Sequence, residues 1–205
     1  MTRRYRMSKR AEEWNRTRER IVRATMEVHD RKGVAPTTFA DIAARAGVGQ
    51  ATVSRHFPTV GHLVQACGQH VWQEMRPPVP ESAAAIFEGL DGTEQRLAKL
   101  VQEVDSFYQR GAHRLDLAFR DRDLVPELDG FLRMIETGVA ALVKEALAPI
   151  AASERAVETV LVLMSFRVWQ AFQRSNLPPS QLQAARIRLL RCSLKEENAG
   201  AAGAS

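Results

Sequence analysis

The segment from Thr37 to Phe57 constrains the fold of this chain most, because two short helical patterns meet there at a glycine. Thr37 or Thr38 can cap a first helix, which Gly47 ends after about two turns. A second pattern begins near Gln50. The apolar positions of both patterns fall on one side: Phe39, Ile42, Ala43, Ala46, Val53 and Phe57. Two short helices joined by a tight glycine turn predict a helix-turn-helix motif over residues 38–57.

Helical periodicity continues along the rest of the chain, and we find no alternating strand pattern, so we expect an all-α fold. We expect Gly111 to end one helix and Ser153 to begin another that runs to about Arg174. The proline cluster at 77–80 predicts a seam between two domains. The predicted divisions are a basic N-terminal arm (1–13), a helix-turn-helix domain (14–76), a second helical domain (81–195) and a flexible tail (196–205).

The net charge of +5 is concentrated at the N-terminal end of the chain. Residues 1–75 contain 13 Lys and Arg against 7 Asp and Glu, which steers a polyanion toward this region, although such a stretch is as often only a solvated surface. The longest apolar run, Val160 to Met164, is far shorter than the ~20 residues that span a bilayer. No secretory signal follows the basic start. We therefore expect a cytoplasmic protein without a membrane partner.

The second helix of the motif carries side chains that are suited to reading double-stranded DNA. A helix fits the major groove, where Gln can pair with adenine and Arg with guanine. Hydroxyl and imidazole groups suit phosphate oxygens. The predicted DNA-binding residues are Thr38, Gln50, Ala51, Thr52, Ser54, Arg55 and His56.

Over about Ile21 to Val71 the chain resembles the tetracycline-repressor-like (TetR) family of bacterial transcription regulators. The shared features are the pattern Thr-Thr-x-x-Asp-Ile-Ala-x-x-Ala-Gly-Val from Thr37, a threonine at the head of the second helix and a closing His-Phe-Pro. The resemblance implies that three helices bind DNA and that a divergent helical remainder binds a small ligand and dimerises. The chain departs from the family where Gly49 replaces a frequent capping serine and where Val60-Gly61 replaces a usual phosphate-binding lysine.

The resemblance also implies a ligand cavity between the middle helices of the second domain. The aromatic residues there are most simply core, and part of them is expected to line an apolar pocket. The candidate pocket residues are Phe107, Tyr108, Arg114, Phe131, Met134, Phe166, Trp169 and Gln170. The last two helices carry more apolar surface than a monomer hides, which predicts a two-fold homodimer. The candidate interface residues are Leu161, Met164, Val168, Leu182, Leu189 and Leu190.

These patterns together predict a homodimeric repressor that a small apolar ligand releases from an inverted-repeat operator. A rival interpretation is a DNA-binding thiol or oxidant sensor that uses Cys67 or Cys192. An all-helical enzyme or scaffold is a third, although no catalytic constellation, phosphate loop or dinucleotide fingerprint is found. His62, Cys67 and His70 are metal-ligand types, but their spacing spreads them around a helix, so we expect no metal and no cofactor.

Overall fold

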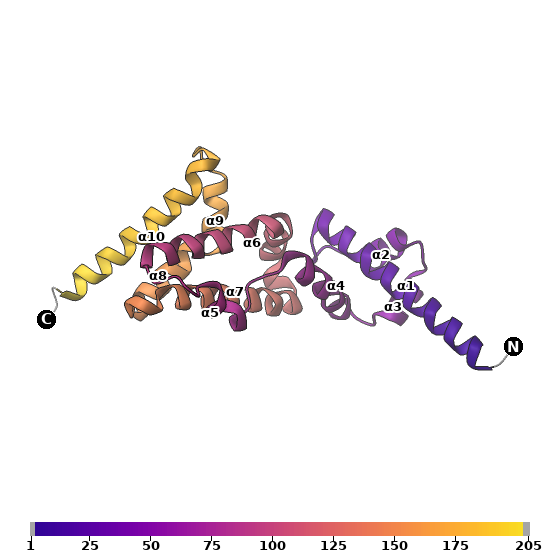
Figure 1. Cartoon of the computed structure of the whole chain (residues 1–205). Coiled ribbons are helices and arrows are strands. Elements are labelled where there is room, and N and C mark those ends of the chain that lie inside the picture. Colours follow the sequence, from indigo (N-terminus) through magenta and orange to yellow (C-terminus); the bar gives the residue numbers. More distant parts are fainter. Residues whose placement is uncertain (1–2, 203–205) are drawn as a thin grey trace. The chain divides into compact units, whose positions relative to one another are not determined.

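The computed structural model describes residues 3–202, with side chains from 7 to 195, and every regular element in that part is a helix (Figure 1). The expected all-α fold is confirmed. The α-helices are α1 (Arg3–Lys32), α2 (Phe39–Ala46), α3 (Gln50–His56), α4 (Val60–Met75), α5 (Ala83–Ile86), α6 (Thr93–Asp121), α7 (Pro126–Leu147), α8 (Glu154–Leu163), α9 (Phe166–Gln173) and α10 (Pro179–Ala202). Short 3-10 helices are η1 (Pro80–Ser82), η2 (Arg122–Leu124) and η3 (Ala148–Ile150). Within the described residues, no helix has the length and apolarity that crossing a bilayer requires.

The chain forms two compact units, and each unit is assembled from two separate stretches. The first unit contains the residues up to Glu74 together with His113–Leu132. The second contains Met75–Ala112 together with the residues from Arg133 onward. The first change of unit falls at Met75, close to the proline cluster at 77–80, and residues 113–132, which the predicted domain 81–195 includes, group with the first unit. Residues 113–132 join the first unit through long-range contacts that no local pattern signals.

The predicted arm at 1–13 is part of helix α1, which begins at Arg3 and runs without a break to Lys32. Residues 3–13 contain no Gly or Pro and consist mostly of strong helix formers. Arg16 and Glu12 add an ion pair one turn apart, at 3.6 Å. At the other end, residues 196–202 continue helix α10 instead of forming the predicted flexible tail, whereas 203–205 lie outside the described residues.

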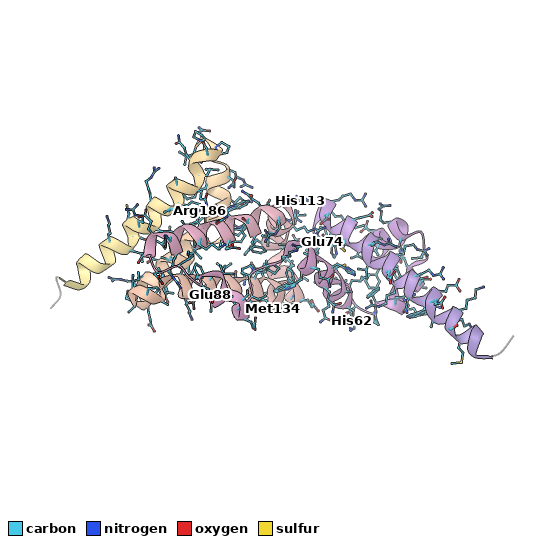
Figure 2. The ribbon with its side chains drawn as sticks, viewed as in Figure 1. His62, Glu74, Glu88, His113, Met134 and Arg186 are labelled. Carbon is cyan, nitrogen blue, oxygen red and sulfur yellow. The ribbon has the colours of Figure 1, made fainter. Side chains whose placement is uncertain are left out.

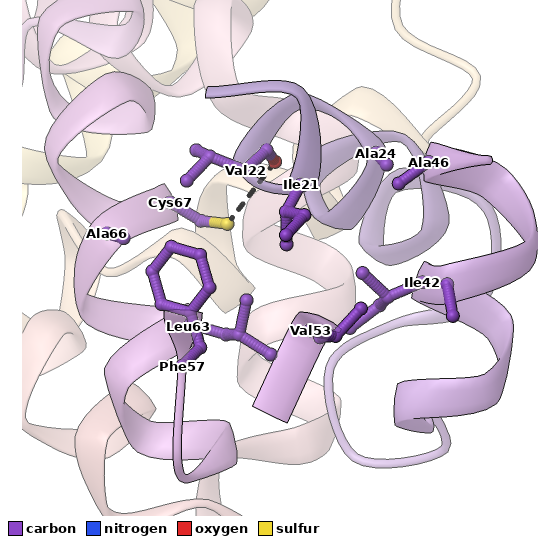
Figure 3. Close-up of a cluster of buried hydrophobic side chains, with 11 residues drawn as sticks. Ile21, Val22, Ala24, Ile42, Ala46, Val53, Phe57, Leu63, Ala66 and Cys67 are labelled. Carbon is purple, nitrogen blue, oxygen red and sulfur yellow. Dashed lines mark hydrogen bonds between the residues drawn. The ribbon is translucent and has the colours of Figure 1, made fainter. Parts of the chain in front are cut away.

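The helix-turn-helix segment folds as its local chemistry predicts. The Thr38 hydroxyl accepts a hydrogen bond from the Asp41 N–H at 3.2 Å, and the Asp41 carboxylate accepts one from the Thr38 N–H at 2.8 Å. Gly47 ends α2 in the left-handed region, with φ of 63°. Helices α1 to α4 then share one core (Figure 3), which includes Ile21, Val22, Ile42, Val53, Phe57, Leu63 and Cys67. This core holds α3 by its inner side.

Two helix boundaries in the second half of the chain differ from the prediction. Helix α6 continues through the buried Gly111, because the helix formers around this glycine offset its weak propensity. The helix that begins after Ser153 stops at Leu163 instead of reaching Arg174, and α9 starts separately. Ser165 caps α9 by accepting a hydrogen bond from the Val168 N–H at 3.5 Å. Both Ser153 and Ser165 are therefore helix starts, and only the first was predicted.

Helix α7 contains a glycine that the packing of the second unit requires. A Cβ atom on Gly138 would overlap the backbone carbonyl of Pro78. The residue is also buried, so nothing larger than hydrogen fits there. By contrast, a Cβ atom on Gly130 of the same helix would meet nothing within 4 Å.

Candidate DNA-binding and effector sites

The outer side of α3 carries most of the predicted DNA-binding residues. Gln50, Ala51, Ser54 and Arg55 are exposed, while Val53 between them is completely buried in the shared core. Thr52 is partly buried, and Thr38 is exposed at the start of α2. Gly49 provides no side-chain cap for α3, as its lack of a side chain requires. The four exposed residues therefore form a short polar surface on a helix that is fixed from behind.

His56 at the end of α3 is packed against α1, which no sequence pattern indicated. Its ring lies 3.7 Å from that of Trp14, measured between centroids, and its Nδ1 atom is buried with no hydrogen-bond partner among the described residues. Burial, followed by the charges of Arg55 and Arg18, lowers the pKa of His56. At neutral pH the imidazole is uncharged, so any phosphate contact by His56 uses a neutral N–H group.

Helix α1 adds positive charge to the surface of the first unit. Seven of the described basic side chains on this helix are exposed: Lys9, Arg10, Arg16, Arg18, Arg20, Arg23 and Arg31. The Arg18 guanidinium also lies 4.7 Å from the centroid of the Phe57 ring. Because α1 is continuous, these charges are displayed on a helix instead of a loose arm.

The last turns of α6 hold the connection between α1 and α2 inside the first unit. The buried carboxylate of Asp121 accepts hydrogen bonds from the N–H groups of Val34 at 2.7 Å and Ala35 at 3.1 Å. Arg120 donates to the carbonyl of Lys32 at 2.8 Å. Burial opposes ionisation of Asp121, but the hydrogen bonds from Arg120 and the two backbone N–H groups outweigh it and lower the pKa.

Arg114, one of the predicted pocket residues, belongs to the same set of contacts. Its guanidinium donates to both carboxylate oxygens of Asp30, at 2.8 and 3.0 Å, and also to Glu74. The N–H groups of this guanidinium are therefore used by carboxylates of the protein itself. The prediction that Arg114 lines a ligand pocket is not supported. Arg114, Arg120 and Asp121 together are named the α6 clamp below.

Four of the predicted pocket residues meet in the core of the second unit. Phe107, Tyr108, Phe166 and Trp169 are between 1% and 4% exposed. The Tyr108 ring lies 5.4 Å from Phe166 and 5.7 Å from Trp169, and its hydroxyl donates to the carbonyl of Met164 at 3.1 Å. These four residues are named the aromatic cluster.

The other predicted pocket residues lie elsewhere. Phe131 belongs to the first unit, where its ring meets that of Trp72 edge to face at 5.5 Å. Met134 is 53% exposed, and the Gln170 side-chain carbonyl accepts a hydrogen bond from Arg167 at 3.3 Å. The sequence could not separate Phe131 and Met134 from the cluster, because they share its helical apolar pattern, and Gln170 was predicted only as a polar side chain on the same helices.

Part of the predicted dimer surface is buried within the single chain. Met164 and Leu190 are 0% and 1% exposed within a single chain, so they are core residues and not interface residues. Leu189 is exposed, while Leu161, Val168 and Leu182 are partly exposed. Val162, at 63% exposure, is an apolar surface residue that the prediction did not include.

The two cysteines differ sharply in accessibility. Cys67 is buried in the core of the first unit, where its thiol donates to the carbonyl of Val22 at 3.7 Å. Burial raises its pKa to about 12, which keeps the thiol protonated and unreactive. Cys192 on α10 is exposed. No group of three His, Cys, Asp or Glu residues with metal-binding geometry occurs in the part of the chain that is described.

Solved structures share this all-helical fold. They include the multidrug binding protein EbrR complexed with imidazole, with 18% identity, a TM-score of 0.58 and coverage of 86% of this chain and 89% of that one. SCO7518 from Streptomyces coelicolor A3(2) matches with 17% identity, a TM-score of 0.58 and coverage of 87% and 98%. The TetR-like transcriptional regulator LfrR from Mycobacterium smegmatis, in complex with proflavine, matches with 24% identity, a TM-score of 0.50 and coverage of 87% and 96%.

The comparison with curated protein sequences gave no match. A family model does match: residues 21–67 fit the description "bacterial regulatory proteins, tetR family". The matched region comprises the C-terminal part of α1 from Ile21, the helix-turn-helix and the first half of α4, and it contains the exposed residues of α3. Over residues 21–67, about a quarter of the chain, the sequence therefore matches the tetR family of bacterial regulatory proteins.

Proposed function

We propose that this protein is a transcriptional regulator, a cytoplasmic, homodimeric repressor that leaves an inverted-repeat operator when a small molecule binds the second unit. The observation that carries the proposal is the outer side of α3, where Gln50 and Arg55 are exposed above the fully buried Val53. A reading helix needs side chains that reach base edges and a scaffold that fixes their position. The basic residues of α1 support the same partner, because they attract phosphate groups.

Dimerisation is supported by the apolar surface that α8 and α10 leave exposed. Val162 is 63% exposed and Leu189 is 40% exposed, with Leu161 and Leu182 partly exposed beside them on the same two helices. A helix pair that meets its two-fold copy covers such a surface and places two reading helices at a fixed separation. The operator is then an inverted repeat whose half-sites lie about one helical turn of DNA, or a multiple of it, apart.

Helix α6 is the element through which an effector would act on DNA binding. Its residues up to Ala112 belong to the second unit and include Tyr108 of the aromatic cluster. Its residues from His113 belong to the first unit and include the α6 clamp, in which Asp121 binds the α1–α2 connection and Arg114 binds Asp30 of α1. An effector that binds one conformation of α6 more tightly changes the conformation of that connection. Moving the population from mostly bound to mostly released takes a preference of about 10⁴-fold for one state.

The test begins by identifying the operator through genome-wide mapping of the sites that the protein occupies. In a mobility-shift titration on that operator, Arg55→Ala is expected to weaken binding roughly tenfold or more and to relax the preference at one base pair. Arg188→Ala removes the same charge from an exposed position on α10, so it serves as the matched control and is expected to bind like the parent. An Arg55→Ala protein with unchanged affinity and footprint contradicts the assignment of α3.

A further inference from the structure

A buried arginine lies beside the aromatic cluster and is not used by anything described so far. Arg186 of α10 is only 2% exposed, although arginine is rarely found inside a protein without partners (Figure 2). One of its terminal nitrogens forms an ion pair with Asp105 of α6. The other donates to the sulfur of Met164 at 3.5 Å, which is a weak acceptor.

The donors of this region outnumber its acceptors. Arg186 Nε is buried without a hydrogen-bond partner among the described residues, and so is the indole Nε1 of Trp169. Asp105 contributes the carboxylate nearby, and its Oδ1 atom already faces Arg186 Nη1. Burial without acceptors also lowers the pKa of Arg186 to about 10. What the region lacks is therefore an acceptor for two N–H groups, and an anionic acceptor fits best because one of them, Arg186 Nε, belongs to a cation whose ion pair with Asp105 leaves that N–H group unused.

The unpaired donors and the aromatic cluster share their neighbours. Trp169 belongs to both, since its ring stacks on Phe166 at 5.6 Å while its N–H group is unpaired. Met164 is a second link, because its carbonyl accepts from Tyr108 and its sulfur accepts from Arg186. Asp105 and Tyr108 are also one turn apart on α6. A ligand with a flat ring and an acidic group at its edge matches both features at once.

We propose that the effector is an aromatic carboxylate, whose carboxylate binds Arg186 and the Trp169 N–H while its ring packs among Tyr108, Phe166 and Trp169. This inference rests on the proposed function and names the ligand class for it. Because these side chains are almost completely buried, the ligand reaches them only when α9 and α10 separate from α6. A cationic aromatic ligand would instead need a free carboxylate, and Asp105 is engaged by Arg186.

The experiment measures binding to the full chain by isothermal titration calorimetry. The probes are benzoate, salicylate and 2-naphthoate, with the neutral 2-naphthamide and the cation proflavine as comparisons. At least one carboxylate is expected to bind, at least tenfold more tightly than 2-naphthamide. If none of the three carboxylates binds at about millimolar concentration, or if only proflavine binds, the inference is wrong.

The variants test the named donors. Arg186→Met is expected to weaken carboxylate binding at least tenfold, whereas Arg188→Met, two residues further along α10 and exposed, is expected to leave it unchanged. Trp169→Phe keeps an aromatic ring and removes only the N–H group, so it should weaken 2-naphthoate severalfold without affecting 2-naphthamide. If circular dichroism shows that Arg186→Met does not fold, Arg186→Lys and Trp169→Phe decide the question. Equal affinity in these variants and the parent would overturn the inference.

The operator mobility shift separates this inference from the function on which it rests. If the protein binds its operator but no aromatic carboxylate, only the ligand class is wrong. If it binds a carboxylate through Arg186 but no operator, the ligand class stands and the proposed repressor function fails.

Discussion

Replacing Asp121 tests whether the α6 clamp stabilises the first unit. In Asp121→Ala, the N–H groups of Val34 and Ala35 lose an ionised acceptor at 2.7 and 3.1 Å. A hydrogen bond to a charged group is worth about 1.5–3 kcal/mol. Both donors belong to residues that are only partly buried, so the lower value applies and the two bonds together amount to about 3 kcal/mol. Arg120 adds little, because its side chain is 52% exposed and the ion pair is screened by water.

The free energy of unfolding is measured by urea titration, and hydrogen exchange at the Val34 and Ala35 amides gives a local measure of the same contact. Asp121→Asn, which keeps the shape and loses the charge, is expected to fall between Asp121→Ala and the parent. Asp123→Ala, an exposed aspartate two residues away, is the matched control and should change stability by less than about 0.5 kcal/mol. If Asp121→Ala costs no more than Asp123→Ala and the two amides keep their protection, the reasoning is refuted.

The same carboxylate has a defined pH dependence. Its pKa is lower in the folded protein than the ordinary value near 3.9 for aspartate. Its contribution to stability is therefore complete above that ordinary value and is lost as the pH falls through the folded pKa. The difference in stability between the parent and Asp121→Ala should shrink in acid below about pH 4. A difference that stays constant from pH 5 to pH 2 would contradict an ionised acceptor.

Three further predictions concern stability and reactivity. Gly138→Ala should destabilise the second unit by about 3 kcal/mol through backbone overlap, whereas Gly130→Ala on the same helix should be neutral or stabilising in the same thermal melt. Burial lowers the pKa of His29 to about 4, against the opposing charges of two aspartates. The free energy of unfolding should therefore fall by about 3 kcal/mol between pH 6.5 and pH 4. His29→Gln should remove this pH dependence. A thiol reagent such as DTNB should modify Cys192 at once and Cys67 only on unfolding, and rapid reaction of Cys67 in the native protein would contradict its burial.

Features that depend on a few neighbouring residues could be predicted from the sequence. Thr38 and Ser153 cap helices, Gly47 ends one, and Val53 is buried between exposed neighbours on α3, because each of these follows from local hydrogen bonding or helical periodicity. The exposed part of the candidate DNA-reading surface was accessible to the same reasoning.

Features that join distant parts of the chain were not predictable in this way. Asp121 binds the N–H of Val34, and Arg186 pairs with Asp105 in a core that periodicity alone marks as apolar. In both cases the sequence shows a charged residue on a helix, which is normally a solvated position. Only the fold reveals that these charges are buried, and why Arg114 is a structural residue of the first unit instead of a pocket residue.

The composition of the first unit from two stretches also fixes the order in which it can be completed during synthesis. A nascent chain that has emerged as far as Glu74 contains the whole reading motif but not Asp121, which secures the loop leading into it. The first unit therefore reaches its final form only after residues up to Leu132 have left the ribosome. A chimaera that joins the first unit to another sensor domain must include residues 113–132, because a chain cut at the proline cluster (77–80) lacks that segment.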